Sequence, residues 1–446
     1  MGFEDRLRRI RGQAAVPEVP PVPSLPDGPT LAERLRRVST GRAVPEPATT
    51  RTPDEAALAA VLGADILAPG VLRLERRLDA RLRHGRGMLG SAHVPQHLPW
   101  PPAEASPGGS GLQPRPDAAE IGEAGSRPQL APTAAHSVWL CLDTETSGLA
   151  GGTGTWAFLT GLLRAAGVGW CLRQYLLTRL DAEAAYLDLM GAELAPDAGP
   201  ACLLTYNGRS FDAPLLTTRF RLAGRPDPLA ALPHLDLLAP TRRAFARVWP
   251  DCRLATAESR LLGVQRADDL PGSAAPAAWL DWLRRGETGP LAAVLRHNRA
   301  DLLSLAGLLP VLDAVYRDPA AFGADCRSVA AAHQARGDQA QALRILAANR
   351  RDLDAAGLHD LARLYRRSRD WGRAIGIWEE LCARGDPEAR AALARFHEHR
   401  SGDLGRALEL ALALPPGPER ERRCRRIAEK LERAGRNLSL GELGVT

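Results

Sequence analysis

The chain has 446 residues, of which 45% are hydrophobic and 25% charged, and its formal net charge is +6. This length and composition predict a globular protein of two or three domains with a sizeable core. The modest positive charge permits an anionic partner without demanding one. No apolar run approaches about 18 residues and the first residues are highly charged, so we expect neither a membrane-spanning helix nor a signal peptide.

The seven cysteines show no C-x-x-C pairing, and several lie inside apolar runs. This pattern is typical of small core residues in a reducing compartment rather than of zinc ligands or a disulfide framework. We therefore expect a cytoplasmic protein with no membrane partner.

The chain before residue 138 divides into three segments by composition. Residues 1–56 mix short basic pieces with a proline-dense tract, which predicts a flexible region. Residues 57–100 form a small ordered segment, with a helix over 55–62 and a strand-like alternation over 70–78. Residues 101–137 are rich in Pro, Ala and Gly and are expected to be a linker.

A strand ending in two acids begins the next segment, residues 138–316, in which we predict a compact α/β unit. Five apolar residues, 138–142, lead into Asp143, Thr144 and Glu145. Side chains alternate along a strand, so the two acids share one face, and hard oxygen ligands of this kind suit Mg²⁺ or Mn²⁺. The alternative is an edge strand whose acids face water, although an apolar run indicates burial on both faces.

The spacing of apolar residues predicts the next strands and helices of this unit. Two strands, 156–164 and 170–178, are consistent with an antiparallel meander. Asp181 is expected to cap a helix. The remaining predictions are a strand at 201–206, a helix at 211–222, a short strand at 234–237, a basic helix with Arg242, Arg243 and Arg247, and a long apolar helix at 291–315.

Further acids follow other elements of this unit. Asp212 begins a helix after a strand, so it can lie at the same end of the sheet as Asp143 and Glu145. Asp301 lies one helical turn after His297, which places both on one helix face. Four converging carboxylates are what a two-metal phosphoryl-transfer site requires, and a histidine beside a ligand can take the proton of the attacking water.

Glycines and asparagines lie beside these acids. The loop 148–154 lacks the third glycine of a dinucleotide fingerprint and any Gly-Lys-Ser/Thr, so we interpret it as a tight turn that brings backbone amides near a substrate. Asn207 and Asn298 are expected to hold substrate or orient ligands, or to serve in turns and behind the ligands. His234 and Asp236 alternate on one strand face, but a pair without further ligands is interpreted as structural.

Three motifs resemble those of the DEDD (DnaQ-like) 3′–5′ exonucleases, which have a ribonuclease-H-like fold. They are D-T-E-T at 143–146, Y-N-G-R-S-F-D at 206–212 and H-N-R-A-D at 297–301. The longer run D-T-E-T-S-G-L-A-G-G-T-G-T-W-A-F-L, with His234-x-Asp236-Leu237 further on, is most similar to YprB-type domains of bacteria. The resemblance implies a mixed sheet with flanking helices and hydrolysis of nucleic acid, with a single-stranded 3′ end as the expected substrate.

The resemblance also implies roles for individual residues. Asp143, Glu145, Asp212 and Asp301 correspond to the ligands of two divalent cations, Mg²⁺ or Mn²⁺, and His297 to the general base. Thr146, Gly148, Asn207 and Asn298 are expected at the substrate. The histidine stands four residues before the last Asp, the spacing of the tyrosine subclass, whereas five is usual for histidine. A structural hydrogen bond of His297 is therefore the alternative role.

The last segment, 317–446, has a period of its own. Ala342-Leu343, Ala374-Ile375 and Ala407-Leu408 recur at intervals of 32 and 33 residues, each after a turn containing Asp. This spacing resembles tetratricopeptide-type helix pairs, with an irregular helical bundle as the alternative. Such an array would bind a protein partner or guide nucleic acid. For the whole chain, a non-catalytic nucleic-acid- or protein-binding module and a structural single-ion site are the alternatives to an exonuclease.

Overall fold

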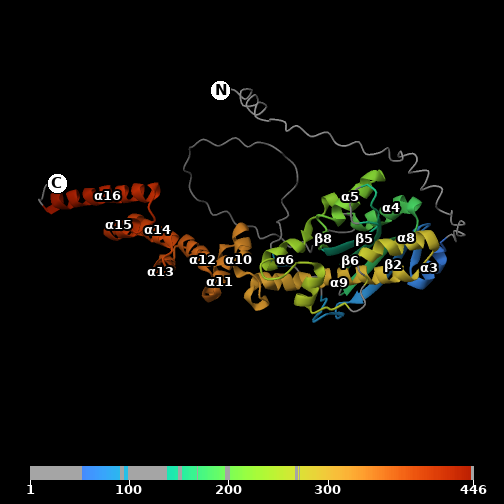
Figure 1. Cartoon of the computed structure of the whole chain (residues 1–446). Coiled ribbons are helices and arrows are strands. Elements are labelled where there is room, and N and C mark those ends of the chain that lie inside the picture. Colours follow the sequence, from blue (N-terminus) through green and yellow to red (C-terminus); the bar gives the residue numbers. More distant parts are fainter. Residues whose placement is uncertain are drawn as a thin grey trace, which may run out of the picture. The chain divides into compact units, whose positions relative to one another are not determined.

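The structure is a computed structural model that describes residues 53–90, 95–98, 138–148, 153–167, 169–195, 201–266, 270 and 272–442 (Figure 1). The predictions for residues 1–52, for 101–137 and for the middle of the glycine-rich loop lie outside these residues. Within the described chain, no helix combines the length and the apolar character that crossing a membrane would need.

One sheet of seven strands forms the centre of the α/β part. Its order is β1-β2-β7-β6-β5-β8-β9, and all neighbours are antiparallel except β5 with β8 and β8 with β9, which are parallel. The predicted meander is confirmed, because β5, β6 and β7 are consecutive antiparallel neighbours. The strands are β1 (Asp65–Ala68), β2 (Val71–Asp79), β5 (Val138–Thr146), β6 (Ala157–Ala166), β7 (Gly169–Leu177), β8 (Ala201–Thr205) and β9 (His234–Asp236).

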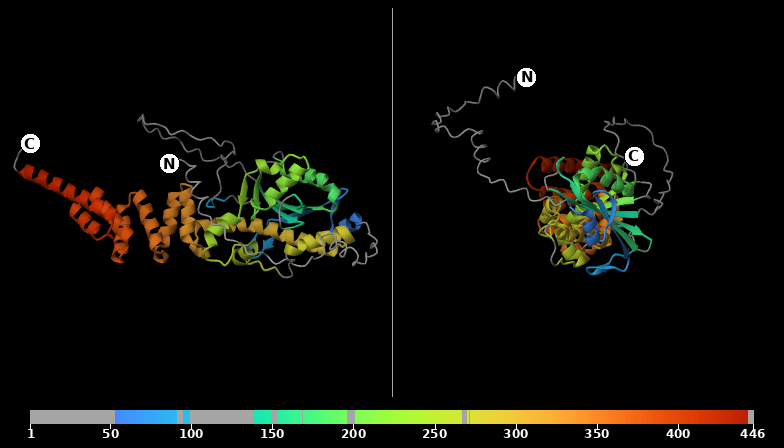
Figure 2. Two further views of the ribbon diagram at one scale, coloured as in Figure 1. Left: turned by 45° about the horizontal axis from the view of Figure 1, so that its top comes forward. Right: turned by 90° about the vertical axis from the view of Figure 1, so that its right-hand side faces the viewer.

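Helices pack on both faces of this sheet (Figures 1 and 2). They are α3 (Glu55–Leu62), α4 (Glu183–Leu194), α5 (Asp212–Leu222), α6 (Leu238–Phe245), α7 (Leu254–Ala257), α8 (Ala275–Arg285) and α9 (Gly289–Arg317). Leu140 and Leu142 of β5 belong to a core with α4, α5 and α8. Trp139 and Cys141, on the other face, join a core with α6 and the C-terminal half of α9. This is the mixed sheet with flanking helices that the sequence predicts.

The described residues of the segment 57–100, which the sequence treats as separate, contribute strands to the same sheet. β2 pairs with β7 along its whole length, from Val71 opposite Leu177 to Asp79 opposite Gly169. A small hairpin of β3 (Arg83–His84) and β4 (Gly87–Met88) packs on a π-helix, Glu258–Leu262, and the N–H of Arg86 donates to the carbonyl of Leu262. Strands on both sides of the linker are therefore needed to complete the fold.

Two local predictions are wrong. Asp181 does not cap α4: a short 3-10 helix, Leu180–Ala182, precedes it, and the N-cap Ala182 has no side chain that could accept a hydrogen bond. Asp181 instead pairs with Arg179 at 2.6 Å on the surface. The basic helix α6 ends at Phe245, so Arg247 lies beyond it.

Residues after α9 form a series of helices in which neighbours along the chain pack together. They are α10 (Cys326–Ala335), α11 (Gln339–Ala348), α12 (Ala355–Arg367), α13 (Trp371–Ala383), α14 (Pro387–Phe396), α15 (Leu404–Leu412) and α16 (Pro418–Glu442), with a π-helix at His397–Ser401. Asp338, Asp370 and Asp403, the turn residues of the predicted period, each accept a backbone N–H at the start of a helix. The helical character is thus established, while the tetratricopeptide assignment stays a prediction.

The remaining short helices are 3-10 turns at Pro228–Ala231, Gly272–Ala274, Ala320–Phe322 and Arg350–Asp352.

Candidate active site

The four acids come from three elements, the strand β5 and the helices α5 and α9. Asp143 and Glu145 lie on β5, Asp212 is the first residue of α5, and Asp301 lies in α9 one turn after His297. Glu145 and Asp212 are buried, with 8% and 6% of their surface exposed. A β-bulge between Glu145 and Thr146 interrupts the pairing with β6 at this point, which is a common feature beside functional sites.

Asp143 shows that the acids lie close together. Burial raises the pKa of its carboxyl well above the usual range, and the neighbouring carboxylates of Asp301, Asp212 and Glu145 raise that pKa further. Opposing this, the side-chain amide of Asn298 donates to Asp143 Oδ2 at 2.8 Å. Four acids in mutual repulsion inside a protein are costly unless a cation joins them.

Two hydrogen bonds from Thr144 of β5 hold the carboxylate of Asp212. β8 pairs with β5 only as far as Cys141, which leaves the backbone N–H of Thr144 without a strand partner. Asp212 Oδ1 accepts that N–H at 3.1 Å and the Thr144 hydroxyl at 2.5 Å. Burial nevertheless raises the pKa of Asp212 to about 6, against the lowering effect of these two hydrogen bonds.

Asn298 connects α9 to the centre of the sheet. Its amide nitrogen donates to Asp143, while its Oδ1 accepts the side-chain amide of Gln174 at 2.8 Å. The Gln174 amide also donates to the Leu295 carbonyl. Gly161, opposite Asp143 on β6, makes this approach possible, because a Cβ there would lie 2.1 Å from Asn298 Oδ1. Asn298 is fully buried, so its contacts are those of a residue that orients Asp143.

Arg266 contributes a cation to the acidic cluster. Its guanidinium donates to Asp301 and also to Glu258, which is 1% exposed. Burial raises the pKa of Glu258, and Arg266 acts against that rise. The guanidinium thus compensates the buried carboxylate of Glu258 and the half-buried carboxylate of Asp301 at once.

Arg266 also contacts the candidate base. Its Nη1 lies 3.3 Å from His297 Nδ1, and the other ring nitrogen, Nε2, lies 3.6 Å from Asp301 Oδ2. A guanidinium can only donate, so a neutral His297 accepts at Nδ1 and carries its proton on Nε2. The imidazole can therefore act as a base only after Arg266 has moved away from it.

The carboxylate oxygens of the cluster fit hard divalent cations as ligands. Within the described residues, no group of three or more His, Cys, Asp or Glu side chains is positioned to hold a metal ion. Asp301 is engaged by Arg266 and Asp212 by Thr144. The four carboxylates could hold cations once Arg266 has left Asp301, because oxygen ligands are what Mg²⁺ and Mn²⁺ prefer.

The residues expected at the substrate have mainly local contacts. Thr146 is buried and its hydroxyl donates to the carbonyl of Gly148 at 2.9 Å. Asn207 has a positive φ of 68°, which asparagine tolerates in turns, and its backbone N–H donates to Asp236. These contacts of Thr146 and Asn207 are therefore those of residues that shape the turns after β5 and β8.

His234 and Asp236 have structural contacts, in line with the sequence interpretation. Asp236 accepts the backbone N–H groups of Asn207, Arg209 and Leu238, which fixes the turn after β8. His234 Nε2 pairs with the Thr205 hydroxyl at 2.8 Å, and burial lowers its pKa to about 4.

Sequence reasoning missed several residues that build this site. Arg266 and Glu258 lie in no motif, and their convergence on Asp301 depends on the tertiary fold. Gln174 is a buried amide within an apolar strand, and Gly161 interrupts the same kind of strand. A glycine inside a strand is a recognised signal of close backbone approach, so only Gly161 could have been found in this way.

Comparisons with known proteins agree with this fold. Residues 140–312 match a family model described as the RNase_H superfamily. The chain is also 32% identical to YprB of Bacillus subtilis (strain 168), described only as an uncharacterised protein, over 283 residues that make up 60% of this chain and 67% of YprB.

Two solved structures of exonuclease I are also similar to this chain, at lower sequence identity than YprB. One, concerned with how processivity is achieved, has 16% identity and a TM-score of 0.27 over 41% of this chain and 44% of its own. The other, the ExoI/SSB-Ct complex, has 18% identity and a TM-score of 0.24 over 36% and 43%. This chain spans less than half the length of these exonuclease I chains. From the match to YprB and to the family model, the chain belongs to the same family as YprB and carries a domain of the RNase_H superfamily.

Proposed function

We propose that the protein is a metal-dependent 3′–5′ exonuclease-like phosphodiesterase that hydrolyses nucleic acid by a two-metal-ion mechanism. The RNase_H superfamily domain supports a nuclease-type hydrolase in general. The observation that best supports this proposal is the environment of Asp143, a half-buried residue whose carboxyl is repelled by three further carboxylates from β5, α5 and α9. A fold gains nothing from such repulsion unless cations relieve it.

Asp143, Glu145, Asp212 and Asp301 would hold the cations. When bound, two divalent ions supply positive charge that stabilises the attacking and leaving oxygens of an in-line displacement. A water then attacks the terminal phosphorus, the bond from phosphorus to the 3′ oxygen breaks, and a nucleoside 5′-monophosphate leaves behind a shortened strand with a 3′-hydroxyl.

His297 is proposed to accept the proton of the attacking water. It lies half-buried on the same face of α9 as Asp301, and positioned bases of this kind contribute about 10²–10⁴-fold to a rate. Asn298 and Gln174 orient Asp143 through their hydrogen bonds. Arg266 must turn away from Asp301 and His297 before catalysis, and a substrate phosphate is a suitable new partner for its guanidinium.

The expected substrate is a single-stranded 3′ end, and the expected location is the cytoplasm. Both follow from the motif resemblance and the cysteine pattern described above. Neither DNA nor RNA is preferred by any contact among the described residues.

A test uses end-labelled single strands, duplexes and circles of DNA and RNA, with Mg²⁺, Mn²⁺ or EDTA. We expect metal-dependent release of mononucleotides from the 3′ end, and a loss of at least about 100-fold in Asp143→Asn. Cleavage in EDTA, or an Asp143→Asn protein as active as the parent, would remove the proposal. Cleavage of circles would replace exonuclease by endonuclease.

A second candidate function is a non-catalytic binding module. It is favoured by the pairing of Arg266 with both Asp301 and Glu258, which satisfies the acids without a metal. The same substrate panel distinguishes the two, because this candidate predicts binding of nucleic acid without cleavage under every metal condition.

A further inference from the structure

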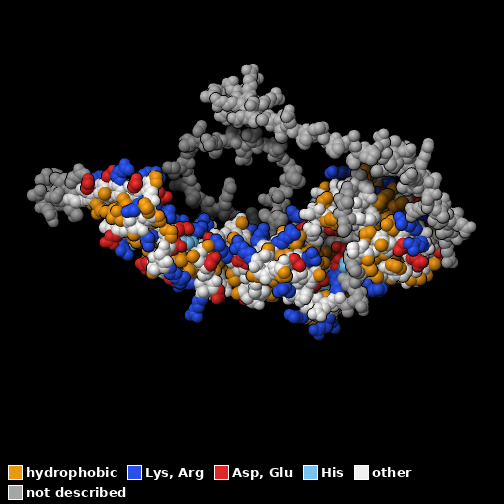
Figure 3. Space-filling model, in the orientation of Figure 1, with side chains coloured by type: hydrophobic (Ala, Val, Ile, Leu, Met, Phe, Trp, Pro, Cys, Tyr) orange, Lys and Arg blue, Asp and Glu red, His pale blue; other side chains and the backbone are white. Residues whose placement is uncertain are grey.

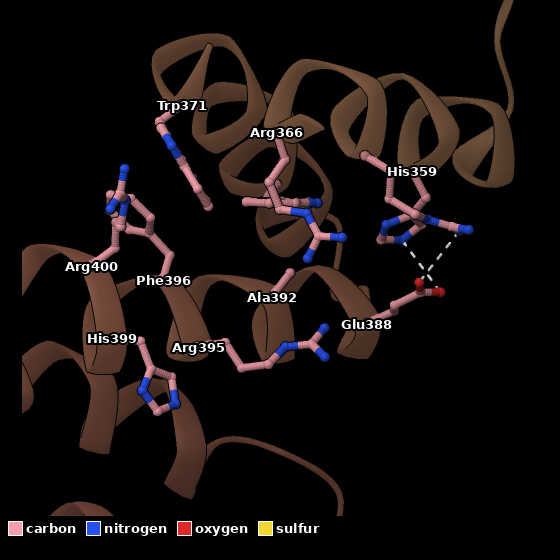
Figure 4. Close-up of a pocket in the computed structure, with 11 residues that line it drawn as sticks. His359, Arg366, Trp371, Glu388, Ala392, Arg395, Phe396, His399 and Arg400 are labelled. Atoms are coloured by element: carbon pink, nitrogen blue, oxygen red, sulfur yellow. Dashed lines mark ion pairs between the residues drawn. The ribbon is translucent and has the colours of Figure 1, made fainter. Parts of the chain in front are cut away.

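A basic cavity lies in the helical region, away from the acids. Its volume is about 450 Å³, and it is formed by α12, α13, α14 and the π-helix after α14 (Figure 4). Four arginines contribute to its wall, at positions 363, 366, 395 and 400, together with the aromatic rings of Trp371 and Phe396. Glu388 is the one acid among the residues that line it.

The positive charges of this cavity are only partly compensated. Glu388 already faces His359 at 4.0 Å and Arg363 at 3.6 Å. Arg366 of α12 and Arg395 of α14 have no ion-pair partner among the described residues, and Figure 4 shows both reaching into the same space from facing helices. Two uncompensated guanidinium groups facing one cavity favour an anion with several oxygens, since each can donate in a bidentate way.

Aromatic rings stand next to these arginines. Trp371 and Phe396 are neighbours, with ring centroids 5.5 Å apart and planes tilted by 35°. Arg400 lies over the Trp371 ring at 5.3 Å. Rings beside guanidinium groups suit a ligand that alternates flat bases with phosphates, because every base can stack and every phosphate can accept. An acidic peptide would use the charges but not the rings.

We propose that this cavity binds a segment of single-stranded nucleic acid, with phosphates at Arg366 and Arg395 and a base against Trp371 and Phe396. This inference rests on the proposed function only in taking nucleic acid as the substrate. The site holds the strand outside the catalytic cluster, so it contributes to affinity for long strands and not to the chemical step.

The test measures fluorescence anisotropy of labelled single-stranded oligonucleotides with the full chain in EDTA, where no cleavage is expected. The variant is Arg366→Ala with Arg395→Ala. Figure 3 shows basic and acidic side chains spread over the visible face of this region, so a general electrostatic contribution is expected. The matched control is therefore Arg344→Ala with Arg367→Ala, which removes two exposed arginines of α11 and α12 that do not line the cavity.

The cavity variant is expected to weaken binding by about tenfold at about 0.1 M salt, and to reduce the slope of log affinity against log salt by about 1.4, whereas the control changes little. Trp371→Leu should weaken binding without changing that slope, because stacking releases no counterions. Equal losses in the cavity and control variants would overturn the proposal in favour of a diffuse basic surface. Binding of an acidic peptide, but of no oligonucleotide, would overturn it in favour of a protein ligand.

Cleavage provides a separate readout. If the protein is a nuclease, the cavity variant should raise KM for a long strand and leave dinucleotide hydrolysis unchanged. If no cleavage occurs in any protein, the anisotropy result still stands, so failure of the proposed function and failure of this inference are distinguishable.

Discussion

Asp212 is the residue whose protonation gives the metal-free site a measurable signature. Its pKa is raised to about 6 by burial, above the ordinary value of 3.8. The folded state therefore binds more protons than the unfolded state between about pH 4 and pH 6, and stability falls as the pH rises through this window. The carboxylate of Asp212 is thus a source of instability at neutral pH without metal.

Asp212→Asn should remove this penalty. In EDTA, its free energy of unfolding relative to the parent is expected to increase from about pH 4 to pH 7, by an amount on the order of 2 kcal/mol. Urea unfolding across this pH range measures it. Asp188→Asn is the control. Arg225 lowers the pKa of that exposed carboxyl, so the contribution of Asp188 to the pH dependence of stability lies below about pH 4. If the difference in free energy of unfolding between Asp212→Asn and the parent does not change with pH, burial does not raise the pKa of Asp212.

Arg266 is the second residue with a specific prediction. It compensates Glu258 and Asp301, so Arg266→Ala should lower metal-free stability by about 3 kcal/mol, the cost of leaving buried charges unpaired. Mn²⁺ should restore more stability to this variant than to the parent, since cation and guanidinium compete for Asp301. Thermal unfolding with and without Mn²⁺ measures both effects.

The control for Arg266 is Arg219→Ala. Arg219 is 4% exposed and pairs with Glu183, outside the acid cluster. The Arg219→Ala variant should be less stable than the parent, but Mn²⁺ should stabilise both by the same amount. If the two variants respond alike to Mn²⁺, Arg266 does not compete with metal.

At the scale of elements, the site depends on how closely α9 crosses the sheet. Gly161 allows this, because a Cβ would lie 2.1 Å from Asn298 Oδ1 and 2.6 Å from Leu302 Cδ1. Gly161→Ala should shift α9, destabilise the fold by about 1–3 kcal/mol and weaken metal binding, because Asn298 and Asp301 move together. Gly376→Ala is the control: its Cβ meets no atom within 4 Å, so the gain in helix propensity should stabilise α13. Unaltered metal affinity in Gly161→Ala would contradict the role given to this approach.

The elements were more predictable than the contacts between them. Apolar runs identify β5, β6 and β7, and apolar periodicity identifies α9, because burial imposes those patterns locally. Asp181 shows the limit: an acid before a helical run is consistent with an N-cap, but a 3-10 turn and the pairing with Arg179 take its place. The contact of Arg266 with Asp301, 35 residues away, has no periodic signal at all.

At the scale of the whole molecule, the acids are predictable as a set because their motifs fall at the ends of regular elements. The participation of β1 and β2 in the sheet was not predictable. The pairing of strands that lie on either side of the segment 101–137 leaves no pattern in the local sequence. The helical region follows from the period of its turns, whereas the basic cavity depends on which side chains of α12 and α14 face each other.

Four carboxylates from β5, α5 and α9 are proposed to form a site for divalent cations. Calorimetric titration of the full chain with Mn²⁺ can count the bound ions in the parent, in Asp143→Asn and in Asp188→Asn as a control. We expect two bound ions in the parent and in the control, and loss of at least one in Asp143→Asn. No Mn²⁺ binding in the parent, or the same stoichiometry and affinity in Asp143→Asn, would contradict this proposal.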